Sequence, residues 1–90
     1  MKYEAMYIVR PTLEEAPRQA LIQEMSDLFS QETEVNEWGM RDLAYEIEKH
    51  KRGYYVVMQS DASPAEVDEF ERISRIREDI IRFMIVKIDE

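Results

Sequence analysis

Alternating apolar and polar positions predict a strand near the start of the chain. In YEAMYIV, residues 3–9, the odd-numbered positions share one face: Tyr3, Ala5, Tyr7 and Val9. The other face carries Glu4, Met6 and Ile8. Because both faces are largely apolar, we predict a central strand. We expect the odd-numbered face to meet the helices, since the opposite register would bury the unpaired carboxylate of Glu4.

A helix is predicted after this strand. Thr12 followed three residues later by Glu15 is a capping-box pattern for a helix that runs to about Ser30. Pro17 fits better at the first helical position than four residues in, so the regular helix could also begin there. Four residues form its apolar stripe: Leu21, Met25, Leu28 and Phe29.

Two further strands are predicted over residues 35–47 and 54–60. The second is rich in aromatic and β-branched residues, as its YYVV run shows. The intervening KHKRG is expected at or near a hairpin tip, with Gly53 as the conformationally permissive residue.

The clearest local signal in the chain opens a second helix. Ser63 is the expected N-cap, Pro64 occupies the first helical position, and Glu66 is the reciprocal capping residue. Its expected core side carries Val67, Phe70 and Ile73. A β-branched strand over residues 80–88, IIRFMIVKI, follows.

The element order β-α-β-β-α-β indicates a single ferredoxin-like α+β domain over residues 1–90. Right-handed crossovers would place both helices on one face of a four-stranded antiparallel sheet of order 4-1-3-2. We expect strand two at one edge and strands one and four at or near the centre. The same plan hosts enzymes, small-molecule sensors and RNA binders, so the fold alone does not decide the function.

Charge narrows the choice of function. The chain has 12 basic and 20 acidic residues, a net charge of −8. Lys49, Lys51 and Arg52 supply three of the basic residues, so the rest carries 9 basic against 20 acidic residues, or −11. An acidic chain must therefore meet a polyanion locally, and this cluster is the place to do so.

Composition removes several classes of function. The chain has 0 cysteines, which excludes thiol catalysis, disulfides and cysteine-rich metal sites. No apolar run is long enough to span a membrane and no signal-type segment is visible at the start, so we expect a cytoplasmic protein. His50 is the single histidine, and we expect an exposed loop residue there and no metal site.

Four blocks of sequence resemble one known family. WGMRDLAYEI, GYYVV, EFERI and IIRFMIVK occur in the order found in the bacterial small-subunit ribosomal protein six family, and the resemblance covers nearly the whole chain. It implies the ferredoxin-like fold, no enzymatic activity and no cofactor. It also implies binding to the central domain of 16S ribosomal RNA together with the eighteenth small-subunit protein.

The resemblance also changes which role we expect for the cationic residues. From spacing alone, the cluster favours a solvated hairpin tip that discourages edge pairing. The resemblance shifts this toward RNA phosphate contacts by Arg41, Lys49, Lys51 and Arg52. Family members usually carry basic residues after Trp-Gly, whereas this chain has Met40, Arg41 and Asp42, so we expect strand two to contact RNA less than usual.

Trp38 is a further candidate site residue. A lone tryptophan in a small domain carries much burial, so a core or protein-interface anchor is favoured over a base-stacking surface. We name it as the candidate contact to a protein partner.

Three other functions are compatible with this element order. An RNA recognition motif would place a small residue and two aromatic rings where RGYYVVMQ has Tyr55, Val56 and Gln59, so its stacking platform lacks the main ring. An acylphosphatase-type enzyme needs a glycine-rich phosphate loop after strand one, which RPTLEEAP does not supply. The alternative kept open is a small-molecule-binding or dimerising module with an apolar patch on the sheet face that lacks helices.

Overall fold

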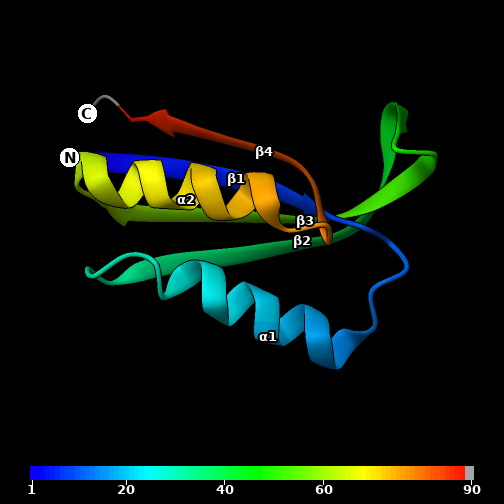
Figure 1. Ribbon diagram of the computed structural model, residues 1–90, viewed down its shortest axis with the longest axis horizontal. Coiled ribbons are helices and arrows are strands. Elements are labelled where there is room, and N and C mark those ends of the chain that lie inside the picture. Colours follow the sequence, from blue (N-terminus) through cyan, green and yellow to red (C-terminus); the bar gives the residue numbers. More distant parts are fainter. Residues whose placement is uncertain (89–90) are drawn as a thin grey trace.

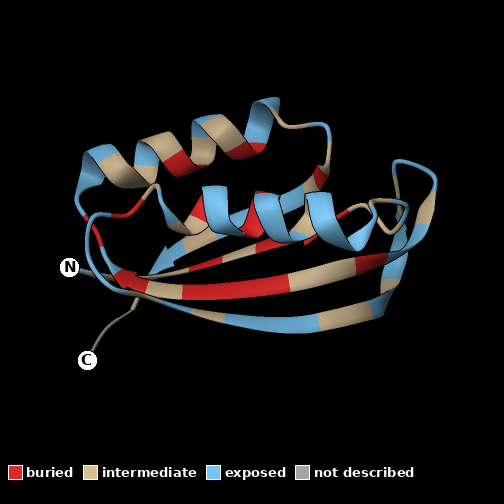
Figure 2. Ribbon diagram, turned by 90° about the horizontal axis from the view of Figure 1, so that it is seen from below, coloured by how far each residue is buried: buried red, intermediate tan, exposed pale blue. Residues whose placement is uncertain are grey.

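Four strands and two helices make up the fold, in the predicted order. The computed structural model describes residues 1–88. The elements are β1 (Lys2–Val9), α1 (Glu15–Ser26), β2 (Thr33–Ile47), β3 (His50–Asp61), α2 (Pro64–Ile76) and β4 (Ile80–Lys87). The antiparallel sheet has the order β2-β3-β1-β4, and both helices cover one face (Figure 1, Figure 2). The ferredoxin-like prediction and the 4-1-3-2 order are confirmed.

One detail of the predicted strand placement was wrong. β4 is an edge strand, because β1 already pairs with β3 on its other side. The two central strands are therefore β1 and β3, and β2 closes the opposite edge as expected.

The core lies between the sheet and the helices, in the predicted register. Tyr7 of β1 and Phe70 of α2 are fully buried, and their ring centroids lie 6.3 Å apart. The other β1 residues of the odd-numbered face also belong to this core or pack against it. Glu4 lies on the opposite face, where its carboxylate accepts a hydrogen bond of 3.0 Å from the Gln59 amide. The sheet face without helices is called the helix-free face below.

The first helix begins at a residue that neither sequence pattern indicated. α1 starts at Glu15, and no side chain caps its first turn. The predicted Thr12 cap fails because the Thr12 hydroxyl instead accepts a hydrogen bond of 2.8 Å from Arg10. Pro17 sits within the first turn, where backbone N–H groups have no acceptor inside the helix. The missing N–H of proline therefore costs no hydrogen bond there. The helix ends at Ser26 rather than near Ser30.

The second helix begins as predicted. The Ser63 hydroxyl accepts from the Glu66 N–H at 3.2 Å, and the Glu66 carboxylate accepts from the Ser63 N–H at 2.9 Å. The same carboxylate accepts from the Ser30 N–H at 2.6 Å, which ties the loop after α1 to the start of α2. These backbone hydrogen bonds, first that of Ser63, lower the pKa of Glu66.

The β2–β3 hairpin projects beyond the rest of the sheet (Figure 1). Ile47 pairs with His50 across a two-residue turn, in which Glu48 and Lys49 have φ angles of 48° and 68°. The turn therefore does not use Gly53, contrary to the prediction. Gly53 instead makes room: a Cβ there would lie 2.3 Å from the Ile8 Cγ2 atom.

Candidate nucleic-acid interface

The predicted cationic cluster lies on the projecting hairpin. Lys49 occupies the turn itself, while Lys51 and Arg52 follow it at the start of β3. All three side chains are exposed, and we call them the hairpin cations. His50 is half-buried and paired in the strand, so the expected exposed loop position was wrong. The cluster thus begins at the tip and continues into β3.

Asp42 neutralises part of this charge. Its carboxylate lies 3.2 Å from the Arg52 Nε, and the two residues are register partners in β2 and β3. Asp42 directly follows Arg41 in the chain. Cross-strand partners share a face whereas chain neighbours point to opposite faces, so Asp42 acts on Arg52 instead. Lys49 and Lys51 form no ion pair within residues 1–88.

Trp38 is not a core residue. Its side chain is 49% exposed, so only the two surface interpretations remain. It occupies a β-bulge of β2, and the next residue, Gly39, has a φ of 86°, a conformation that favours glycine. Its ring stacks on Tyr55 with centroids 6.5 Å apart, and the Arg41 guanidinium lies 4.9 Å from its centre. Arg41 therefore belongs to the helix-free face and not to the hairpin tip.

A polar network that the sequence reasoning missed links the hairpin to α1. Glu37 accepts hydrogen bonds from the Tyr54 hydroxyl at 2.7 Å and from the Gln19 amide at 2.9 Å. The hydrogen bond from Tyr54, followed by that from Gln19, lowers the pKa of Glu37. The same hydrogen bond between Tyr54 and Glu37 raises the pKa of Tyr54. Arg18 lies over the Tyr54 ring at 4.0 Å. These contacts hold the base of the hairpin against the helix layer.

Four arginines lie over aromatic rings instead of meeting carboxylates. These pairs are Arg18 with Tyr54, Arg41 with Trp38, Arg75 with Phe83, and Arg82 with Tyr45. None of the four arginines forms an ion pair within the described part of the chain. The pairing of Arg82 with Tyr45 was not predicted, because it joins residues 37 positions apart. Strand alternation alone could have placed Arg82 on the helix-free face.

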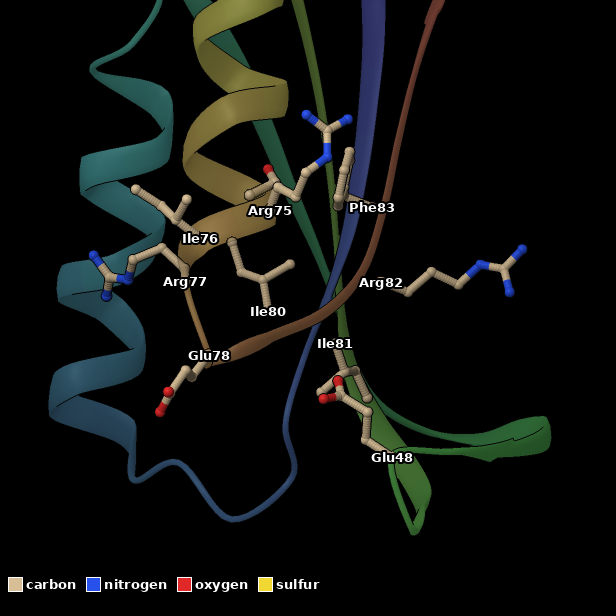
Figure 3. Close-up of a pocket in the computed structure, with 10 residues that line it drawn as sticks. Glu48, Arg75, Ile76, Arg77, Glu78, Ile80, Ile81, Arg82 and Phe83 are labelled. Atoms are coloured by element: carbon tan, nitrogen blue, oxygen red, sulfur yellow. The ribbon is translucent and has the colours of Figure 1, made fainter.

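A depression at the end of α2 is not a convergent site. It lies between the end of α2, the start of β4 and the hairpin turn, with a volume of about 760 Å³. Figure 3 shows Arg75, Arg77 and Arg82 pointing away from one another around it. Arg77 is engaged with Glu24 at 2.6 Å. Such diverging side chains do not form a pocket for one anion.

Two other features are absent from residues 1–88. No three or more acidic or histidine side chains there are grouped to hold a metal ion. No helix in the same range is long and apolar enough to cross a membrane.

The fold and the exposed hairpin define a small ferredoxin-like domain with surfaces suited to macromolecular contacts. Residues 2–87 match the family model described as Ribosomal protein S6. The chain therefore belongs to the ribosomal protein S6 family, whose members are structural proteins and not enzymes. The resemblance seen in the sequence is confirmed.

Individual relatives agree with this assignment. The chain is 45% identical over 91 residues to "Small ribosomal subunit protein bS6" of Helicobacter acinonychis, covering 97% of this chain and 64% of the relative. It is 35% identical over 92 residues to the protein of the same name from Moorella thermoacetica, covering 98% and 94%. The crystal structure of 30S ribosomal protein S6 from Thermotoga maritima superposes with a TM-score of 0.88 at 29% identity, covering 94% of this chain and 84% of that one.

Proposed function

We propose that this chain is a structural protein of the bacterial small ribosomal subunit. In this role it binds the central domain of 16S ribosomal RNA together with the eighteenth small-subunit protein. Family membership and the names of its relatives support the ribosomal role and a cytoplasmic location on the ribosome. The observation that carries the RNA contact is the projecting hairpin, which presents exposed cations from an otherwise acidic chain.

The RNA side of the proposal uses the hairpin cations. Phosphate contacts position a protein on RNA and need cations that project from a rigid support, not base-reading geometry. The network around Glu37 supplies the rigid support at the hairpin base. Lys49 and Lys51 are the stronger phosphate ligands, because Asp42 competes for Arg52. Arg41 would contact RNA from the helix-free face.

The protein side of the proposal uses the apolar half of the helix-free face. Met6 of β1 is the register partner of Val57 on β3 and of Met84 on β4, and Met84 is 51% exposed. Trp38 lies where this half meets the hairpin base and remains our candidate contact to the partner. A protein that covers these side chains would remove apolar surface from water.

The same exposed apolar residues favour one second candidate, a module that dimerises through its sheet. The molecular mass in dilute solution separates the two functions. A monomer agrees with heterologous ribosomal partners, whereas a tight homodimer would favour the dimerising module.

The RNA contact is tested by reversing the hairpin cations in the triple variant Lys49→Glu, Lys51→Glu and Arg52→Glu. Its binding to a central-domain RNA fragment, with the eighteenth protein present, is measured across a salt series. We expect a large loss of affinity and a salt dependence flatter by about one unit of slope per lost phosphate contact. The fold should persist, because exposed substitutions usually change stability by about 0.5 kcal/mol or less each.

A matched control carries the same charge change elsewhere. Arg72, Arg75 and Lys87 are exposed residues of α2 and β4, and their replacement by glutamate should affect binding far less. Circular dichroism verifies the folding of both variants. Equal affinities and equal slopes for the hairpin variant and the parent protein would mean that the hairpin cations are only a solvated turn.

A further inference from the structure

Three aromatic rings lie between two arginines in a line across the helix-free face near the hairpin base. The line runs through five residues, which we call the arginine–aromatic surface: Arg41, Trp38, Tyr55, Tyr45 and Arg82. The first three are in contact through the ring stack and the guanidinium over Trp38. At the other end the Arg82 guanidinium donates a hydrogen bond to the Tyr45 hydroxyl and lies near its ring.

A hollow separates the two halves of this line. It has a volume of about 180 Å³ and is walled by Tyr45, Tyr55 and Arg82, with Ile8 and Leu43 among its other lining residues. The register explains its position. Ile8 pairs with Tyr55 on one side and Arg82 on the other, so all three side chains share the helix-free face. Residues 43–46 of β2 lie in an irregular stretch of the pairing with β3, and Tyr45 from this stretch lines the hollow.

The local charge favours an anionic ligand. Arg41 and Arg82 have no carboxylate partner within residues 1–88. The carboxylates of Glu37 and Asp42 are engaged on the other face, with Gln19 of α1 and with Arg52. Glu48 lines the neighbouring depression together with Arg82 but forms no ion pair with it. On the helix-free face itself, Glu4 lies four residues along β1 from Ile8, or about 13 Å at the usual rise per strand residue.

The rings favour a ligand with a flat π-face. Tyr45 is 62% exposed, the largest exposed fraction of any aromatic side chain among the exposed large apolar residues of the described chain. Unpaired nucleobases stack on aromatic side chains and on arginine planes, and their phosphates bind the adjacent cations. An apolar protein segment would satisfy the rings but would leave both guanidinium groups without anions.

We propose that the arginine–aromatic surface binds one unpaired nucleobase of an RNA strand. The base occupies the hollow against Tyr45 and Tyr55, and Arg82 and Arg41 contact the flanking phosphates. This inference rests on the proposed RNA-binding function and adds a second contact, separate from the hairpin cations. It also gives Trp38, the candidate contact to the protein partner, a place on the RNA-binding surface through its stack on Tyr55. It differs from an RNA recognition motif, because the outermost rings come from β2 and not from the two central strands.

The test uses the full chain and six-nucleotide single-stranded oligouridine and oligoadenosine. Trp38 is the single tryptophan of the chain and stacks on Tyr55, so its fluorescence reports occupancy directly. Anisotropy of labelled oligonucleotides gives the affinity independently. We expect saturable quenching by the single strands and much weaker quenching by an RNA duplex, whose bases are not free to stack.

Two variants separate stacking from charge. Tyr45→Leu keeps an apolar side chain but removes the ring, and it should weaken oligonucleotide binding about ten- to a hundredfold with an unchanged salt slope. Arg82→Gln should weaken binding and flatten the slope by about one unit. Arg75→Gln is the matched control, because Arg75 also lies over a ring without an ion pair but belongs to the helix layer. It should bind like the parent chain.

The outcomes distinguish this inference from the proposed function. Undiminished binding by Tyr45→Leu, equal quenching by duplex and single strand, or no oligonucleotide binding at all would overturn the inference. So would quenching of Trp38 by the eighteenth protein and not by RNA. In each case the hairpin contact to the central-domain fragment could still hold. Conversely, the hairpin triple variant could bind the RNA fragment like the parent chain while Tyr45→Leu loses single-strand binding. That result would overturn only the hairpin contact.

Discussion

Gly53 shows how one missing side chain allows the hairpin to leave the sheet where it does. The Ile8 Cγ2 atom occupies the space that a Cβ at Gly53 would need, and Leu43 closes the other side at 3.5 Å. The glycine is thus required by close packing between β3 and β1 and not by turn geometry. Residue type alone does not separate these two uses of glycine. The prediction that Gly53 serves the turn was wrong for this reason.

Gly53→Ala should destabilise the fold by about 1–3 kcal/mol, since a methyl group inserted into a packed site forces its neighbours to move. The midpoint of urea unfolding measures the change. Combining it with Ile8→Ala removes the clashing atom, so the double variant should lose less stability than the sum of the two single losses. An unchanged midpoint for Gly53→Ala would contradict the packing explanation.

Asp42 places a carboxylate beside one of the hairpin cations, Arg52. Asp42→Asn should raise the affinity for the central-domain RNA fragment, because Arg52 then loses its competing carboxylate. We also expect the salt dependence to steepen by up to about one unit of slope. Stability should change little, since exposed ion pairs contribute roughly 0.2–1 kcal/mol. An affinity unchanged by Asp42→Asn would show that Arg52 does not reach phosphate.

At the scale of elements, the start of a helix could be predicted where its cap is local, but not where contacts between distant residues decide it. The start of α2 was predictable because its cap is completed within four residues, Ser63 to Glu66. The start of α1 was not, because Arg10 takes the Thr12 hydroxyl while its Nε is held by Asp79, a residue 69 positions away. Charge density likewise revealed the hairpin cations. The contact of Tyr45 with Arg82 depends on the irregular course of β2, which no local pattern encodes.

The carboxylate that joins the two helix regions makes stability depend on pH. The pKa of Glu66 is lowered in the folded state, so its contribution is present above the unfolded pKa of about 4.3 and is lost as the pH falls through the folded value. The protein should therefore unfold at lower urea concentration as the pH drops from about 5 to 3. The lowered pKa of Glu37 acts in the same direction.

Glu66→Gln tests this assignment. A glutamine oxygen can still accept from a backbone N–H but cannot ionise, so the variant should show a weaker loss of stability toward low pH than the parent chain. Glu71→Gln is the control within the same helix and should retain the parent's pH dependence. Parallel pH profiles for Glu66→Gln and the parent chain would remove Glu66 as a source of the effect.

At the scale of the whole molecule, charge is distributed unevenly over the surface. A net charge of −8 repels RNA at long range, so we expect the proposed association with RNA to rely on local surfaces and on a protein partner. The hairpin cations and the arginine–aromatic surface adjoin through β2 and β3, whereas the apolar half of the helix-free face extends toward β4. One domain can thereby contact RNA and a protein at the same time.

Crosslinking within purified small ribosomal subunits tests the central claim most directly. Mass spectrometry after RNA–protein crosslinking identifies which residues of the chain lie against ribosomal RNA in the assembled particle. We predict that the chain is present and that the peptide containing Lys49, Lys51 and Arg52 is crosslinked to the central domain of 16S ribosomal RNA. Absence of the chain from the particles, or its presence with crosslinks only to elements far from the hairpin, would contradict the account.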